Sequence, residues 1–167
     1  MDSRTSKTRE LAELAVMCAL MFGGKEALRM IPNVHPVMLI IMLCVIWYGW
    51  KTIYPVIGFV IVQIALYGLG IWTINYVYIW PLAVAISMPL RGSTRWWLWA
   101  VVAGAYGFAF GALCAIPYVF ISGWQAAVAY WMAGIPFDLI HGVSNFIIVL
   151  VLLPVLNKSL RLFKSNN

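Results

Sequence analysis

The sequence predicts an all-α membrane protein: a bundle of six transmembrane helices with both termini in the cytoplasm and a short outer helix before the last span. The 167 residues are 64% hydrophobic and 10% charged, whereas soluble domains are about 45–50% apolar and about 25% charged. Apolar runs long enough to cross a bilayer alternate with short turns. The basic residues gather on one side of the predicted bundle, which indicates its orientation.

All but two of the eleven Lys and Arg residues fall in tails or turns on one side of the membrane, when the apolar runs are threaded through it in order. Basic residues in short loops mark the cytoplasmic side. The charges lie at span ends and not in one patch, so orientation and the lipid bilayer explain them, and no nucleic acid is expected as a partner. The positions on this side are Arg4, Lys7, Arg9, Lys51, Arg91, Arg95, Lys158, Arg161 and Lys164.

The first three spans are expected over about residues 10–30, 36–50 and 52–69, within one domain that covers residues 1–167. The two remaining basic residues, Lys25 and Arg29, lie near the outer end of the first span, where Glu26 can pair with them. Pro32 then ends the helix. Span two would be only about 22 Å long, short of a hydrocarbon core of about 30 Å.

The last three spans follow a glycine-rich break at residues 68–70. Span four contains the aromatic stretch 72–80 and ends near residue 90, and the turn 91–95 is an inner loop. Span five begins at residue 96, contains a G-x-x-x-G spacing that permits close helix packing, and is expected to end at Pro117. Gly134 and Pro136 are expected to separate the short outer helix, residues 124–133, from span six, residues 136–156.

No catalytic, metal or cofactor site is expected. The three cysteines lie inside apolar runs without a C-x-x-C spacing. The sequence has no paired carboxylates, no H-E-x-x-H motif and no phosphate-binding glycine loop. ATP hydrolysis by this chain is therefore not expected.

Three polar residues lie on one face of the last span. Asp138, His141 and Asn145 are spaced by three and four residues, which places them on one side of a helix. Polar side chains in a membrane often face a cavity or a substrate path. The alternative is internal bonding, with His141 bonded to Asp138 near the start of the helix. The pattern leaves both interpretations open.

Aromatic residues cluster in the outer segments. Trp and Tyr are enriched at membrane interfaces in proteins that bind nothing there, but rings with a few amides also suit the wall of a ligand pocket. Both interpretations stay open for Trp72, Asn75, Tyr76, Tyr78, Tyr118, Trp124 and Tyr130.

Small residues form a narrow face on the first span. Ala12, Ala15 and Ala19 recur at helical spacing, with Ala15 and Ala19 four residues apart. Small residues permit close approach of another helix. That helix can belong to this chain or to a partner protein.

These features together resemble the S component of an energy-coupling factor (ECF) vitamin importer. The resemblance extends over nearly the whole chain and is carried by its length, the six expected spans, the Ala15-x-x-x-Ala19 spacing and the stretch GIPFDLIHGVSNF at residues 134–146. The family implies a prokaryotic cell-membrane protein that captures a vitamin from outside and delivers it through a transmembrane coupling subunit driven by two separate ATPases.

The resemblance also implies roles for individual residues. Asn33 and His35 would line the vitamin pocket from the first outer loop, and the aromatic residues would line it from the second and third outer loops. Asp138, His141 and Asn145 would form the floor of the pocket. Ala12, Ala15 and Ala19 would face the coupling subunit. Cobalamin is the best guess for the vitamin, and pantothenate, pyridoxine and queuosine precursors remain alternatives.

A secondary carrier or channel and a membrane enzyme are the two alternatives to an S component. A stand-alone secondary carrier or channel predicts an inverted repeat or a charged path through the bilayer, and the sequence has neither. A membrane enzyme would use Asp138 and His141 as acid and base.

Overall fold

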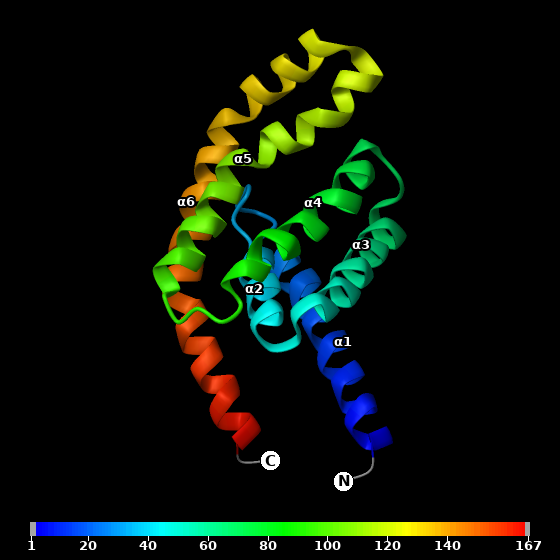
Figure 1. Ribbon diagram of the computed structural model, residues 1–167. Helices are drawn as coiled ribbons and strands as arrows, with labels where there is room; N and C mark the ends of the chain where they lie inside the picture. The colour runs from blue at the N-terminus through cyan, green and yellow to red at the C-terminus, as the bar shows by residue number, and fades with distance from the viewer. Residues whose placement is uncertain (1–2, 166–167) are drawn as a thin grey trace.

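The computed structural model describes residues 3–165, with side chains described for residues 7–162. Within this range the regular structure consists of helices joined by short turns, without a β-strand, which confirms the predicted all-α class. Figure 1 shows the order of the helices along the chain. The helices are α1 (Ser3–Ala27), α2 (Val37–Tyr48), the 3-10 turn η1 (Gly49–Thr52), α3 (Ile53–Tyr67), α4 (Ile71–Ser87), the 3-10 turn η2 (Met88–Leu90), α5 (Trp96–Ser122) and α6 (Trp124–Ser165).

Among the described residues, four helical stretches are long and apolar enough to cross a membrane. The first of them joins α2, η1 and α3, which follow one another without an intervening loop, although the chain reverses direction at η1. Helix α1 is not one of the four, so the expected count of six spans stays a prediction. The stretches are Val37–Tyr67, Ile71–Leu90, Trp96–Ser122 and Trp124–Leu162.

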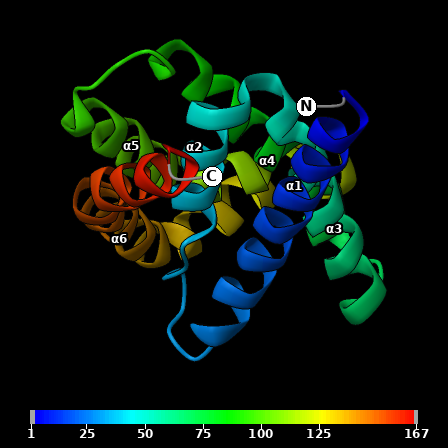
Figure 2. The ribbon, with the colours of Figure 1, turned by 90° about the horizontal axis from the view of Figure 1, so that it is seen from below.

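Helix α2 lies at the centre of the bundle. Its residues from Val37 to Val45 are all buried, and Figure 2 shows α2 between the α5–α6 pair on one side and α1 and α3 on the other. Its 12 residues span only about 18 Å. A helix enclosed by protein does not need to match the thickness of the bilayer, because its side chains contact other helices in place of lipid.

The break between α2 and α3 depends on a glycine. Gly49 has φ +58°, a left-handed conformation that other residues adopt only with strain. A Cβ atom at this position would also lie 2.7 Å from the guanidinium group of Arg91. The chain therefore reverses within a short 3-10 turn that contains Lys51, between the two expected spans.

Helices α5 and α6 form a long hairpin that projects beyond the other helices (Figure 1). A Cβ atom added to Gly107 would lie 2.7 Å from the backbone of Gly142, and one added to Gly104 would lie 3.3 Å from the carbonyl oxygen of Gly142. The two backbones therefore cross closely, which confirms the packing role predicted for the glycine spacing on span five.

Two predicted helix ends are wrong. Helix α5 continues past Pro117 to Ser122, and α6 runs without a break through Gly134 and Pro136. The short outer helix 124–133 is therefore the first part of α6 and not a separate element. A proline removes one hydrogen bond from a helix and kinks it, but packing of α5 on α6 holds both helices together across these positions.

The basic segments gather at one end of the bundle. Figure 1 shows the start of α1, η1, the turn 91–95 and the end of α6 at this end. Lys51 Nζ lies 2.6 Å from Glu10 Oε1, which ties η1 to α1. At the other end of α1, Glu26 pairs with Lys25 at 3.6 Å and with Arg29 at 3.8 Å, as predicted. The side chains of Arg4 and Lys164 lie outside the described residues.

Candidate functional site

One cavity lies where the turn after α1 meets the facing sides of α5 and α6. Its volume is about 460 Å³, which falls within the range of small-molecule sites, about 300–1,000 Å³. Three of the predicted site residues, Asn33, Tyr130 and Asp138, contribute to its wall. The full lining is Pro32, Asn33, Phe110, Gly111, Cys114, Tyr130, Ala133, Gly134, Phe137 and Asp138.

Asp138 supplies a carboxylate to this wall. Its side chain is buried, with 6% of its surface exposed. Oδ1 accepts a hydrogen bond from the backbone nitrogen of Gly111 at 2.9 Å, whereas Oδ2 has no hydrogen-bond partner among the described residues. Burial of an unsatisfied carboxylate oxygen is costly, so the Asp138 carboxylate is the candidate polar group of this wall.

A smaller cavity of about 170 Å³ adjoins the first. The two share Pro32, Asn33 and Phe110 as a common wall. The smaller one differs in charge because basic side chains line it. Its other lining residues are Lys25, Leu28, Arg29, Ile31, Val34, His35 and Tyr76.

Two histidines meet between the cavities and the core. The ring centroids of His35 and His141 are 5.0 Å apart, and the ring of Phe110 lies 4.7 Å from that of His141. Neither ring nitrogen of His141 has a hydrogen-bond partner within the described part of the chain. Burial, followed by the nearby charge of Lys25, lowers the pKa of His35 to about 4. His35 is therefore neutral at physiological pH.

The bond between Asp138 and His141, which was one of the two interpretations of this face, is not present. The contacts of His141 are with aromatic rings, and Asp138 bonds to the backbone of α5. Asn145 lies on the same buried face, with 1% of its surface exposed, and its Nδ2 atom has no partner in the described range. The predicted common face of the three residues is confirmed, and it packs toward the bundle interior.

The aromatic residues of α4 form an internal cluster and not an outer loop. Tyr76 contacts Trp72 and Trp80, with ring centroids 5.2 Å and 5.4 Å apart. The hydroxyl group of Tyr78 donates to the carbonyl oxygen of Leu113 at 2.6 Å and lies 3.1 Å from Oδ1 of Asn75. Of these predicted residues, Tyr76 lines the smaller cavity. Tyr78, together with Asn75, instead forms hydrogen bonds where α4 packs against α5.

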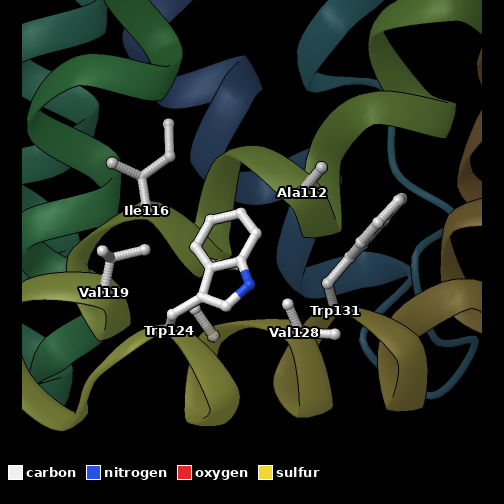
Figure 3. A pocket seen from close by; sticks show the side chains of 8 residues that line it. Ala112, Ile116, Val119, Trp124, Val128 and Trp131 are labelled. Carbon is white, nitrogen blue, oxygen red and sulfur yellow. The ribbon is translucent and has the colours of Figure 1, made fainter.

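The residues expected in the third outer loop lie in helices, because Gly123 is the sole break between α5 and α6. Tyr118 and Tyr130 stack across this hairpin with centroids 4.4 Å apart. Trp124 lines a separate cavity of about 230 Å³ (Figure 3). Its lining is Ala112, Ala115, Ile116, Val119, Trp124, Ala127, Val128 and Trp131. It has no charged side chain, and its only polar side-chain groups are the two indole N–H groups, so it offers few groups that could orient a ligand.

Residues of α5 complete the site but were not predicted to do so. Phe110, Gly111 and Cys114 line the larger cavity. The sequence did single out Gly111, as the last residue of the G-x-x-x-G spacing on span five. That spacing was interpreted only as a helix-packing motif and not as part of a ligand site. Lys25 and Arg29 line the smaller cavity, although the sequence suggested only local pairing for them.

The predicted partner face on α1 is exposed. Ala12, Ala15 and Ala19 all lie at the surface of the described chain, next to the exposed apolar side chains of Val16 and Leu20. The face is therefore not used for packing within this bundle.

Comparisons of this chain with protein-family models, with curated proteins and with solved structures gave no match.

Proposed function

We propose that this chain is the substrate-binding S component of an ECF-type vitamin importer in a prokaryotic cell membrane. It would bind a vitamin from outside, associate with a transmembrane coupling subunit, and release the vitamin inside when two separate ATPase subunits hydrolyse ATP. Both chain ends would lie in the cytoplasm, with six membrane-spanning helices, because the basic segments gather at one end of the bundle.

The observation that carries the proposal is the 460 Å³ cavity beside Asp138. The cavity is lined by the first part of the stretch 134–146, the same stretch that most resembles S components. It combines aromatic rings with a few polar groups, as ligand sites do. It also lies toward the end of the bundle opposite the basic segments, where a molecule from outside would enter.

The volume of the cavity favours a compact vitamin. A pocket of about 460 Å³ has the size of sites for drug-sized ligands. Cobalamin is larger than such ligands, so most of it would lie outside this pocket unless the projecting α5–α6 hairpin moved. Pantothenate, pyridoxine and queuosine precursors are closer to this size, and we place them ahead of cobalamin.

The exposed alanine face of α1 supports the proposed partner. Ala12, Ala15 and Ala19 leave a shallow strip on the described surface, between larger apolar side chains such as Leu11 and Leu20. A strip of this kind permits close approach of a second helix within a membrane. We assign it to the coupling subunit.

A thermal-shift screen of the purified protein against water-soluble vitamins tests the proposal. A ligand that binds only the folded state raises the melting temperature. Ala133→Trp would fill the cavity and remove the shift, whereas Ala129→Trp, about one helical turn earlier on the exposed surface of α6, would retain it. The absence of a shift with every vitamin, or equal shifts in both variants, would reject the proposed site.

A further inference from the structure

Asp138 is electrostatically isolated. The other acidic side chains in the described range are near basic groups: Glu10 pairs with Lys51, Glu13 with Arg9, and Glu26 with Lys25 and Arg29. No ion pair joins Asp138 to any basic side chain described in the structure. A buried carboxylate without a cation nearby is costly, and in membrane proteins such groups mark ligand or ion paths.

The surrounding wall offers this carboxylate no cation. Lys25 and Arg29 line the neighbouring cavity and not this one. The larger cavity instead presents the rings of Phe110, Tyr130 and Phe137. Aromatic faces attract cations, so both the carboxylate and the rings favour a positively charged group over a negative one.

Gly111 holds the carboxylate in place. Its backbone nitrogen donates to Oδ1 of Asp138 at 2.9 Å, and the carboxylate occupies the space that a Cβ atom at residue 111 would need. One carboxylate oxygen is thus used for positioning. The other, Oδ2, is the oxygen nearest to that Cβ position and has no hydrogen-bond partner among the described residues, so the carboxylate keeps unused acceptor capacity.

We infer that the larger cavity selects ligands that carry a protonated amine, with the carboxylate of Asp138 accepting a hydrogen bond from the ammonium group and the aromatic rings packing against the body of the ligand. This inference rests on the proposed function and narrows its substrate class. Gly111 is a positioning residue in this arrangement, because it acts on the ligand through Asp138.

Pairs of probes that differ in one amine test the inference. Pyridoxamine and pyridoxine share a ring and differ in an aminomethyl against a hydroxymethyl group. The queuosine precursors 7-aminomethyl-7-deazaguanine and 7-cyano-7-deazaguanine also share a ring system. The first carries an aminomethyl group, and the second carries a neutral nitrile at the same position. Pantothenate serves as an anionic probe without an amine. Dissociation constants for the purified protein are measured by calorimetry at one pH and salt concentration.

The expected result is a preference for the amine member of at least one pair by roughly 10- to 100-fold, since a hydrogen bond to a charged group contributes that much. Asp138→Asn keeps an oxygen that accepts the hydrogen bond from Gly111 but removes the negative charge. The two members of each pair should then bind with about equal affinity. Glu13→Gln, which removes a carboxylate from α1 that does not line this cavity, should leave the preference unchanged.

The outcomes separate the two proposals. Tightest binding of pantothenate or of a neutral pair member would overturn the amine inference and still support a vitamin-binding protein. An amine preference that survives in Asp138→Asn would also overturn it. Failure of all five probes to bind would count against both proposals. The comparison of amine and non-amine probes uses the wild-type protein alone. It therefore tests the amine inference even where Asp138→Asn does not fold.

Discussion

The backbone nitrogen of Gly111 in α5 donates a hydrogen bond to the carboxylate of Asp138 in α6, with 2.9 Å between the nitrogen and Oδ1. The contact is possible because residue 111 has no Cβ atom, since the carboxylate occupies that space. Helix packing and the orientation of the candidate ligand group therefore depend on the same glycine.

Replacement of Gly111 by Ala should destabilise the protein and weaken ligand binding. The new Cβ atom would push the Asp138 carboxylate away from α5, and overpacking of this kind typically costs about 1–3 kcal/mol. The free energy of unfolding in detergent and the vitamin dissociation constant provide the measurements.

Gly134→Ala is the matched control for that substitution. Gly134 also lies on the cavity wall, but a Cβ atom there meets nothing within 4 Å. The Gly134→Ala substitution should leave the free energy of unfolding unchanged or raise it by up to about 1 kcal/mol, because alanine is more favourable than glycine inside a helix. Equal destabilisation by both variants would contradict the assigned role of Gly111.

Tyr78→Phe should lower stability without a direct effect on the cavity. The hydroxyl group of Tyr78 donates to the carbonyl oxygen of Leu113, and loss of such a bond costs about 0.5–1.5 kcal/mol. Tyr78 lines neither of the two adjoining cavities. We therefore expect a lower melting temperature and an unchanged dissociation constant, with the exposed Tyr54→Phe as control. A large loss of affinity in Tyr78→Phe would instead place its hydroxyl group in the ligand site.

His35 should make stability depend on pH. Burial lowers the pKa of His35 from 6.5 to about 4 in the folded protein, so the unfolded chain binds more protons between these values. Stability should therefore fall as the pH drops from 6.5 toward 4, by about 2 kcal/mol at pH 5.

The contribution of His35 is isolated by comparison with His35→Asn. Unfolding free energies of both proteins are measured from pH 7.5 to pH 5. The variant should lose the part of the pH dependence that His35 causes, so the difference between the two curves changes across this interval. Parallel curves would show that His35 is not held neutral by its surroundings.

Bulky residues on the alanine face of α1 should block transport but not binding. Ala15 and Ala19 are exposed, so Ala15→Trp and Ala19→Trp would leave the bundle and its cavity intact while obstructing the approach of a partner helix. Uptake in cells that also express the coupling and ATPase subunits should be lost, with vitamin affinity retained. Val77→Trp, on an exposed face of α4, should leave uptake intact, and normal uptake by the α1 variants would refute the docking role.

Helix limits marked by strong local signals could be predicted from the sequence. The expected spans 36–50 and 52–69 correspond to α2 and α3, and the turn 91–95 separates η2 from α5. Gly68, in the expected glycine-rich break at residues 68–70, has a positive φ angle. Gly49 has one too, but Lys51 and not Gly49 marked the junction of these spans in the sequence.

Prolines inside α5 and α6 gave misleading signals. Pro117 and Pro136 were expected to end or divide a span, yet both lie within continuous helices. The expectation assumed that one span has about 20 residues, whereas α6 has 42 and extends roughly 63 Å. Its packing against α5 depends on contacts such as Gly107 with Gly142, and pairings across the fold cannot be read from local sequence.

The candidate site could be predicted only in part for the same reason. Spacing along one helix identified Asp138 and its buried face. The neighbours of Asp138 in the cavity, Asn33 and Gly111, come from distant parts of the chain, and they meet only because the turn after α1 packs against the α5–α6 hairpin. Cavity volume, which sets the size of the ligand, depends on that assembly.

The most direct measurement is calorimetric titration of the purified protein with water-soluble vitamins, with Ala133→Trp as the cavity-filling variant. We expect one compact vitamin to bind the wild-type protein at a single saturable site and not to bind the variant. Saturable binding that persists in Ala133→Trp would show that the cavity beside Asp138 is not the ligand site, and no binding of any vitamin to the folded wild-type protein would reject a vitamin-binding function.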